Sequence, residues 1–188
     1  MTDTAFPQIP LLVIGYGDRR KGDNSAGFRV AEALKQSNSK FIQALSVNQL
    51  SSNLASVVAK ANLVIFVSSY SVSDNRKPEI MIKHFLPNYE RTECGLSYPN
   101  PPHSLLSFVQ GVYGKKPDAY WILIPAVNDK FHSYLSPITR KGIKDTLEYL
   151  TGETYNNCLT PQVYPYGESQ KSDFTVKASS YCYCVEAS

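Results

Sequence analysis

A chain of 188 residues, of which 43% are hydrophobic and 19% charged, is long enough for one domain with a buried core and too short for two ordinary domains. This composition excludes a disordered chain, and a net charge of +3 with scattered Lys and Arg gives no reason to expect nucleic acid or a membrane as a partner. The N-terminus has no secretory or membrane-spanning pattern, so we expect a cytoplasmic protein with four reduced thiols: Cys94, Cys158, Cys182 and Cys184.

The first half of the chain alternates apolar runs that are typical of buried strands with segments that have the apolar spacing of helices. The predicted elements are, in order, strand, helix, strand, helix and strand over 11–16, 26–36, 41–47, 50–61 and 63–67. Asp23 and Asn24 stand before the first helix, where either side chain could cap its N-terminus.

The second half continues the alternation after a more polar stretch. The predicted elements are a strand, a helix, a strand and a helix over 80–85, 103–113, 120–124 and 137–150. The first of these strands has a mixed pattern, which places it at or near a sheet edge, and the Pro-rich residues 87–102 predict a long loop. Ser136 and Pro137 have the residue types of N-cap and N1 positions, and Gly152 follows the last helix as a C′ glycine.

Strands that alternate with helices predict a three-layer α/β/α sandwich around a mixed, mostly parallel five-stranded sheet. We assign residues 10–150 to this domain. Helical spacing ends near Thr151, so residues 151–188 form an appended tail, whose tyrosines favour a contact surface for a partner. Cys182 and Cys184 in this tail are interpreted as ordinary thiols, with a soft-metal or redox pair as the alternative.

A glycine-rich loop between the first strand and the first helix is the most informative stretch, because ligand crevices of open α/β sheets form at such loops. Its glycines and short polar residues are Gly15, Gly17, Asp18, Gly22, Asp23, Asn24 and Gly27. A dinucleotide-binding fingerprint would need a glycine where Arg20 stands, and no Walker lysine pattern is present. Binding of a nucleotide or another small ligand is therefore a minor alternative.

The same loop resembles that of the nickel-dependent hydrogenase maturation endopeptidases, whose pattern is Gly-x-Gly-Asn-x-x-x-x-Asp-(Asp/Glu)-x-x-Gly before a helix. Gly15, Gly17, Asp23 and Gly27 match this pattern. Further matches are the strand 63–67, His103 at the start of a helix, and the Leu-Ser-Pro of 135–137. The resemblance covers roughly residues 10–150 and implies the family's α/β fold.

Three departures affect the site that the resemblance implies. Asn24 stands where the family has the second acid of the loop, Ser68 stands where an acid follows the third strand, and 47–49 replace a Gly-Gly-Thr motif. In the family, the two acids and a histidine contact the nickel of the hydrogenase large subunit that is cut. Of these metal contacts only His103 is retained, so we expect Asp23, Asn24, Ser68 and His103 to meet in one crevice that binds divalent metal weakly.

These substitutions predict a protein that resembles a hydrogenase maturation protease but does not cleave peptides by the metal-guided mechanism. Whether the chain is an enzyme stays open at this point, because an active endopeptidase with a rearranged carboxylate pair from Asp18, Asp23 and Asp74 is an alternative. No cofactor is expected, and nickel enters only if the family mechanism is retained. The expected partner is a protein, either a hydrogenase large subunit or another complex, bound through the crevice or the tail.

Overall fold

The computed structural model describes residues 9–37, 39–72, 78–85, 102–128, 130 and 134–152. These residues form a five-stranded sheet in the order β2-β1-β3-β5-β4. Its strands are β1 (Ile9–Tyr16), β2 (Ile42–Val47), β3 (Ala61–Ser71), β4 (Met81–Phe85) and β5 (Asp118–Ala126). The first three and β5 run parallel, while β4 is antiparallel to β5 and lies at an edge, as predicted.

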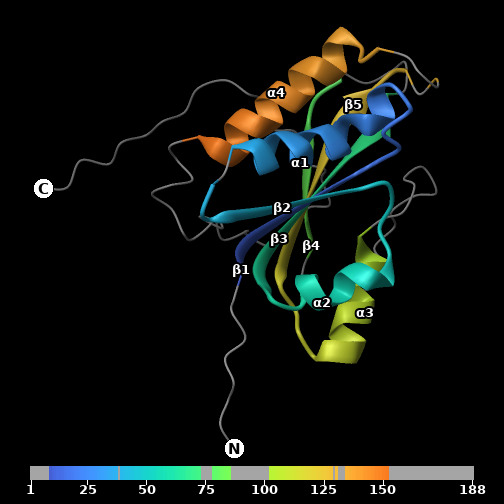
Figure 1. Ribbon diagram of the computed structural model, residues 1–188. Coiled ribbons are helices and arrows are strands. Elements are labelled where there is room, and N and C mark those ends of the chain that lie inside the picture. The colour runs from blue at the N-terminus through green and yellow to red at the C-terminus, as the bar shows by residue number, and fades with distance from the viewer. Residues whose placement is uncertain are drawn as a thin grey trace, which may run out of the picture.

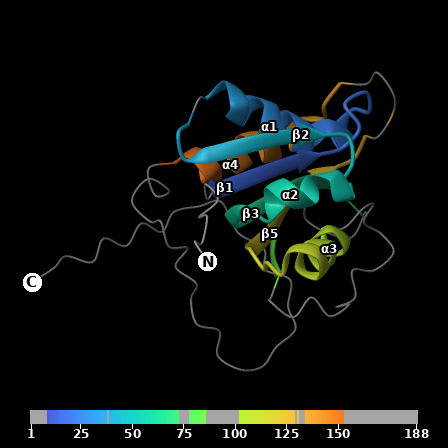
Figure 2. The ribbon, with the colours of Figure 1, turned by 60° about the horizontal axis from the view of Figure 1, so that its bottom comes forward.

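Helices cover both faces of the sheet, which confirms the three-layer sandwich (Figures 1 and 2). The helices are α1 (Ala26–Gln36), α2 (Ala55–Val58), α3 (His103–Tyr113) and α4 (Pro137–Thr151). α1 and α4 pack on one face, and α2 and α3 pack on the other. α2 is much shorter than the predicted helix over 50–61, because a 3-10 turn (Ser52–Leu54) precedes it and β3 already begins at Ala61.

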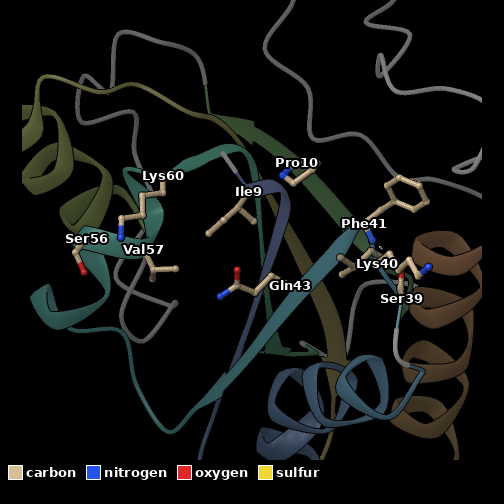
Figure 3. Close-up of a pocket in the computed structure, with 10 residues that line it drawn as sticks. Ile9, Pro10, Ser39, Lys40, Phe41, Gln43, Ser56, Val57 and Lys60 are labelled. Atoms are coloured by element: carbon tan, nitrogen blue, oxygen red, sulfur yellow. Dashed lines mark hydrogen bonds between the residues drawn. The ribbon is translucent and has the colours of Figure 1, made fainter. Parts of the chain in front are cut away.

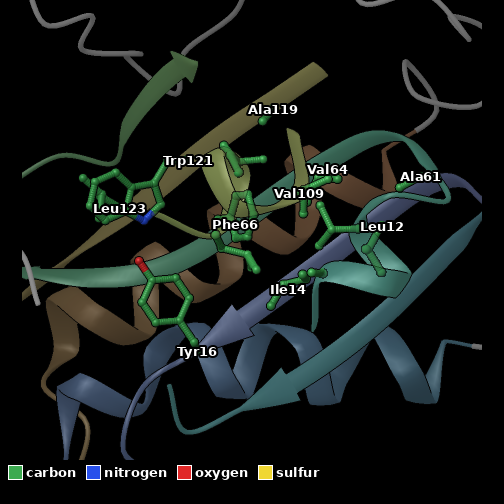
Figure 4. Close-up of a cluster of buried hydrophobic side chains, with 14 of the residues drawn as sticks. Leu12, Ile14, Tyr16, Ala61, Val64, Phe66, Val109, Ala119, Trp121 and Leu123 are labelled. Carbon is green, nitrogen blue, oxygen red and sulfur yellow. The ribbon is translucent and has the colours of Figure 1, made fainter. Parts of the chain in front are cut away.

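Alternate residues of the central strands supply the two halves of the core. On β3, Val64 and Phe66 join the cluster beneath α2 and α3, whereas Ile65 and Val67 join the cluster beneath α1 and α4. Figure 4 shows the first cluster, in which Tyr16 at the end of β1 lies with Phe66. Both faces of the parallel strands are therefore buried, which explains their continuous apolar runs.

The helix ends agree with the sequence in one place and differ in another. Ser136 caps α4 as predicted: its side chain accepts a hydrogen bond from the N–H of Thr139, and Pro137 occupies the first turn. Gly152 directly follows α4, but its backbone is extended, with φ −60° and ψ 156°, rather than in the left-handed conformation common for such glycines. The left-handed glycine is Gly114, at φ 62°, which ends α3.

Several predictions fall on residues outside the described ranges. These include the loop 87–101, Asp74, the four cysteines and the tail beyond Gly152. Among the described helices, none combines the length and apolar character needed to cross a bilayer.

Candidate functional site

The glycine loop lets three backbone segments meet at the carboxyl end of the sheet. A Cβ atom on Gly15 would lie 1.9 Å from the carbonyl oxygen of Gly27, and one on Gly27 would lie 2.1 Å from the carbonyl oxygen of Val67. Gly17 has a φ of 145°, which side-chain-bearing residues rarely adopt. The start of α1 thus packs directly against the ends of β1 and β3. A side chain at Gly15 or Gly27 would clash with backbone atoms there.

Asp23 lies in the 3-10 turn Asp23–Ser25 before α1 and is 0% exposed. One carboxylate oxygen accepts hydrogen bonds from the backbone N–H groups of Val127 and Asn128, both at 2.9 Å. The other accepts the N–H of Ser136 at 2.7 Å. The Asp23 N–H in turn donates to the carbonyl of Asn128 at 2.8 Å. Asp23 therefore fastens the glycine loop to the loop between β5 and α4.

This arrangement corrects the N-cap interpretation of Asp23 and Asn24. Neither the 3-10 turn nor α1 has a side-chain cap bond, because the Asp23 carboxylate turns away from its own helix to a loop more than a hundred residues later. Burial acts to raise the pKa of this carboxyl, but the hydrogen bonds from Ser136, Val127 and Asn128 together hold the pKa below its ordinary value. Asp23 is consequently an ionised structural carboxylate whose bonding directions are largely used.

Asn24 is half-buried beside Gly17, and its Oδ1 lies 3.3 Å from the position that a Cβ on Gly17 would occupy. No hydrogen bond of its side chain is found within the described ranges. Asp18, on the same loop, accepts hydrogen bonds from the backbone N–H and the guanidinium of Arg20, and the first of these lowers the pKa of Asp18 most. Asn24 is thus an uncommitted neutral amide, while the nearby Asp18 is paired.

Ser68 lies within β3, opposite Leu123 of β5, and is only 5% exposed. By strand alternation, its side chain faces α2 and α3, like that of Phe66 two residues earlier. Its hydroxyl forms no hydrogen bond with any residue that the structure describes. The strand was predicted to end at Val67, but β3 continues to Ser71, so Ser68 is held by rigid backbone rather than by a loop.

His103 is the first residue of α3, as predicted, and it is half-buried. Only four residues separate the end of α3 from the start of β5, so α3 runs back along the sheet and its N-terminus points toward the carboxyl edge (Figure 1). This topology puts His103 and Ser68 on the same face of the sheet. That these two residues, Asn24 and Asp23 share one crevice remains a proposal.

The donors at this edge do not fit a divalent metal. Asn24 and Ser68 offer neutral oxygens, His103 offers one imidazole, and Asp23, next to Asn24 in the chain, is already bound to three N–H groups. Among the described residues, no group of three or more His, Cys, Asp or Glu side chains could hold a metal ion. These described donors alone would not supply the negative charge that stabilises a bound divalent ion.

A groove of about 630 Å³ lies at the amino ends of the parallel strands, the opposite end of the sheet from the glycine loop (Figure 3). Residues that begin strands line it, among them Ile9 of β1 and Gln43 near the start of β2, together with Val57 of α2. Ligand crevices of parallel sheets form at the carboxyl ends of the strands. The groove is thus separate from the candidate site.

The long-range role of Asp23 is the functional feature that the sequence reasoning missed. Its bonds reach backbone N–H groups, and such partners leave no residue-type signature in the sequence. The matched Leu-Ser-Pro of 135–137 was a partial signal, since Ser136 supplies one of these N–H groups.

No protein-family model and no curated protein sequence matches the chain. Solved structures do match. The hydrogenase maturating endopeptidase HybD from Escherichia coli superposes with a TM-score of 0.60 at 21% identity, over 74% of this chain and 88% of that protein. The [NiFe] hydrogenase maturation protease HycI from Thermococcus kodakarensis gives 0.63 at 19% identity, over 82% of this chain and 97% of that protein. HybD from the same archaeon gives 0.62 at 17% identity, over 74% and 95%. The chain therefore has the fold of the hydrogenase maturation proteases.

Proposed function

We propose that this chain is a hydrogenase-maturation-protease-like protein that does not cleave peptides by a metal-guided mechanism. Instead it uses the carboxyl edge of the sheet, or its C-terminal tail, to bind or regulate a protein partner. We expect a hydrogenase large subunit as the partner, because the proteins that share the fold are named for hydrogenase maturation.

The observation that supports this proposal is the lack of free negative charge among the described residues of the edge. Asn24 and Ser68 stand where the resemblance places two carboxylates, and each substitution removes a unit charge that would lie directly against a divalent ion. Asp23 cannot replace them where it stands, because its side chain is fully buried and already accepts three N–H groups. Among the described residues, no uncommitted carboxylate of this loop remains to hold a metal that would recognise a processed site or polarise a peptide bond.

The fold itself argues for retention of a binding role. The glycines that press α1 against β1 and β3, and the buried Asp23 that fastens the neighbouring loop, keep the edge rigid without any metal. A preorganised edge lowers the entropic cost of binding a partner. The edge is therefore suited to recognition even where it is not suited to metal-assisted hydrolysis.

Calorimetric titration with Ni²⁺ tests the proposal on the full chain. Weak or undetectable binding is expected for the unmodified protein, and Asn24→Asp combined with Ser68→Asp should raise the affinity more than either change alone, because both charges act on one ion. Asn62→Asp adds the same charge at the start of β3, on the opposite edge, and should leave the affinity unchanged. Tight stoichiometric binding by the unmodified protein that His103→Ala abolishes would instead favour a metal-dependent endopeptidase.

A further inference from the structure

We propose that the outer side of β2, together with the groove at its start, is a docking surface for an extended, acidic segment of a partner protein, which adds to the sheet as a further strand. This surface is called the β2 side, and it comprises the backbone of Ile42–Val47 and the groove of Figure 3. The groove lies at the amino ends of the parallel strands, so the inference is independent of metal binding at the carboxyl edge.

β2 is the outermost strand on its side of the sheet, and among the described strands it pairs with β1 alone. The N–H of Gly17 donates to the carbonyl of Val47 at 3.3 Å, so the backbone of Val47 faces β1. In a parallel pair this direction alternates along the strand, and the N–H and C=O groups of Ile42, Ala44 and Ser46 therefore point away from β1. Within the described chain, no hydrogen bond to these groups is found. An extended backbone can complete such a row of donors and acceptors.

The two outermost strands of the sheet differ in their protection against strand addition. Sheets commonly block their outer strands with a charged residue, a proline or a bulge. β4 carries the charged Lys83 at its centre. β2 has the sequence IQALSV, without a charged residue, a proline or a glycine, and its register with β1 is continuous, so no bulge twists it away. Nothing in the sequence or the register of β2 therefore opposes the pairing of another strand.

The groove continues this surface on the face of the sheet that carries α2. Because α2 has only four residues, it leaves space over the amino ends of β1 and β2. Figure 3 shows Ile9, Gln43 and Val57 pointing into this space. Phe41, which is 59% exposed, lines the groove as well. Neighbouring strands lie about 4.8 Å apart, so a side chain that an added strand places beside Gln43 would reach the apolar lining.

The charge of the groove selects an acidic partner. Lys40 and Lys60 line the groove, whereas no Asp or Glu does. Both lysines are exposed, and neither forms an ion pair within the described chain. Carboxylates on the added segment would be attracted by both cations. A second copy of this chain fits less well, because it would bring the same two lysines and a net charge of +3. A nucleic acid has no peptide groups with which to complete β2.

The experiment titrates the full-length protein, labelled with ¹⁵N, with the probe peptide N-acetyl-Glu-Val-Thr-Val-Thr-Val-Glu-amide. Saturable chemical-shift changes are expected at the backbone amides of Ile42, Ala44 and Ser46, and hydrogen exchange at these amides should slow because they gain acceptors. The same peptide with Lys in place of both Glu residues should bind at least about tenfold more weakly. Of two further peptides, N-methylated at the valines or at the threonines, one should lose binding, because only alternate N–H groups of the added strand face β2.

Two charge reversals at exposed lysines provide the matched control. Lys40→Glu should weaken binding of the acidic peptide about tenfold, whereas Lys116→Glu, which makes the same change outside the groove, should leave it unchanged. Equal weakening by both variants would overturn the assignment to this groove.

Three other results would overturn the proposal. They are no binding of the acidic peptide, equal binding of the lysine peptide, and undiminished binding of both N-methylated peptides. Slow exchange at the amides of Ala44 and Ser46 before any peptide is added would overturn the choice of partner. It would assign the β2 side to a second copy if the protein sediments as a dimer, and to another segment of this chain if it sediments as a monomer.

Discussion

Replacement of Asp23 by Asn tests whether a buried carboxylate fastens the glycine loop to the loop between β5 and α4. The change keeps the size of the side chain but removes its charge and one of its two acceptor oxygens. Since one oxygen serves Ser136 and the other serves Val127 and Asn128, the amide leaves one or two part-buried N–H groups without an acceptor. Each such loss costs about 1–3 kcal/mol, so we expect destabilisation of about 2–5 kcal/mol.

Urea unfolding followed by circular dichroism measures this change, and it should lower the midpoint without altering the slope. Hydrogen exchange at the amides of Val127, Asn128 and Ser136 should accelerate in the variant. Asp18→Asn is the control, because it makes the same substitution in the same loop at a carboxylate with a solvent-accessible partner, Arg20. Equal midpoints for Asp23→Asn and the unmodified protein would refute the role assigned to Asp23.

The difference in unfolding free energy between the unmodified protein and Asp23→Asn should also depend on pH. The pKa of Asp23 in the folded protein lies below its ordinary value of 3.8, so its contribution to stability is fully present above that value. It is lost as the pH falls through the lower pKa of the folded state. The stability gap between the unmodified protein and Asp23→Asn should therefore be constant near neutral pH and shrink in the acid range. A gap that widened on acidification would contradict the assignment.

The remaining predictions concern the glycines and the cap of α4, all measured as the free energy of unfolding in urea. Gly27→Ala should destabilise the fold by about 3 kcal/mol or more, because its Cβ would lie 2.1 Å from a backbone oxygen. Gly111→Ala is the control: it lies at an exposed helix position with nothing within 4 Å, and should stabilise the fold by about 0.5–1 kcal/mol. A Gly27→Ala protein as stable as the unmodified one would contradict the close approach. Ser136→Ala should cost about 1 kcal/mol through loss of the cap to Thr139, and no change would mean that the cap is not formed in solution.

Much of the fold could be predicted because its signals are local. α3 has the predicted bounds, and α4 begins at Pro137 as its cap residues indicate. The edge position of β4 also followed from its mixed pattern. The predicted helix over 50–61 was too long because apolar spacing cannot distinguish a helix from a single turn that packs the same residues, here Ala55 and Val58, against the core.

The candidate site was less predictable than the fold because its bonds span the chain. Asp23 stands directly before a helix, where a local interpretation favours a cap, yet its three partners lie on a loop that follows the last strand. A buried carboxylate gains more from three converging N–H groups than from the one or two that a cap offers. Tertiary contact therefore overrode the local preference at this residue.

The three N–H partners of Asp23 also determine which substitutions could create a metal site at the carboxyl edge. Turning its buried carboxylate outward to a metal would take the acceptor from the part-buried N–H groups of Val127, Asn128 and Ser136, at about 1 kcal/mol or more each. New charge must therefore come from positions whose side chains are uncommitted, and Asn24 and Ser68 meet that condition. The double substitution should therefore raise the affinity for a divalent ion while Asp23 keeps its three N–H partners.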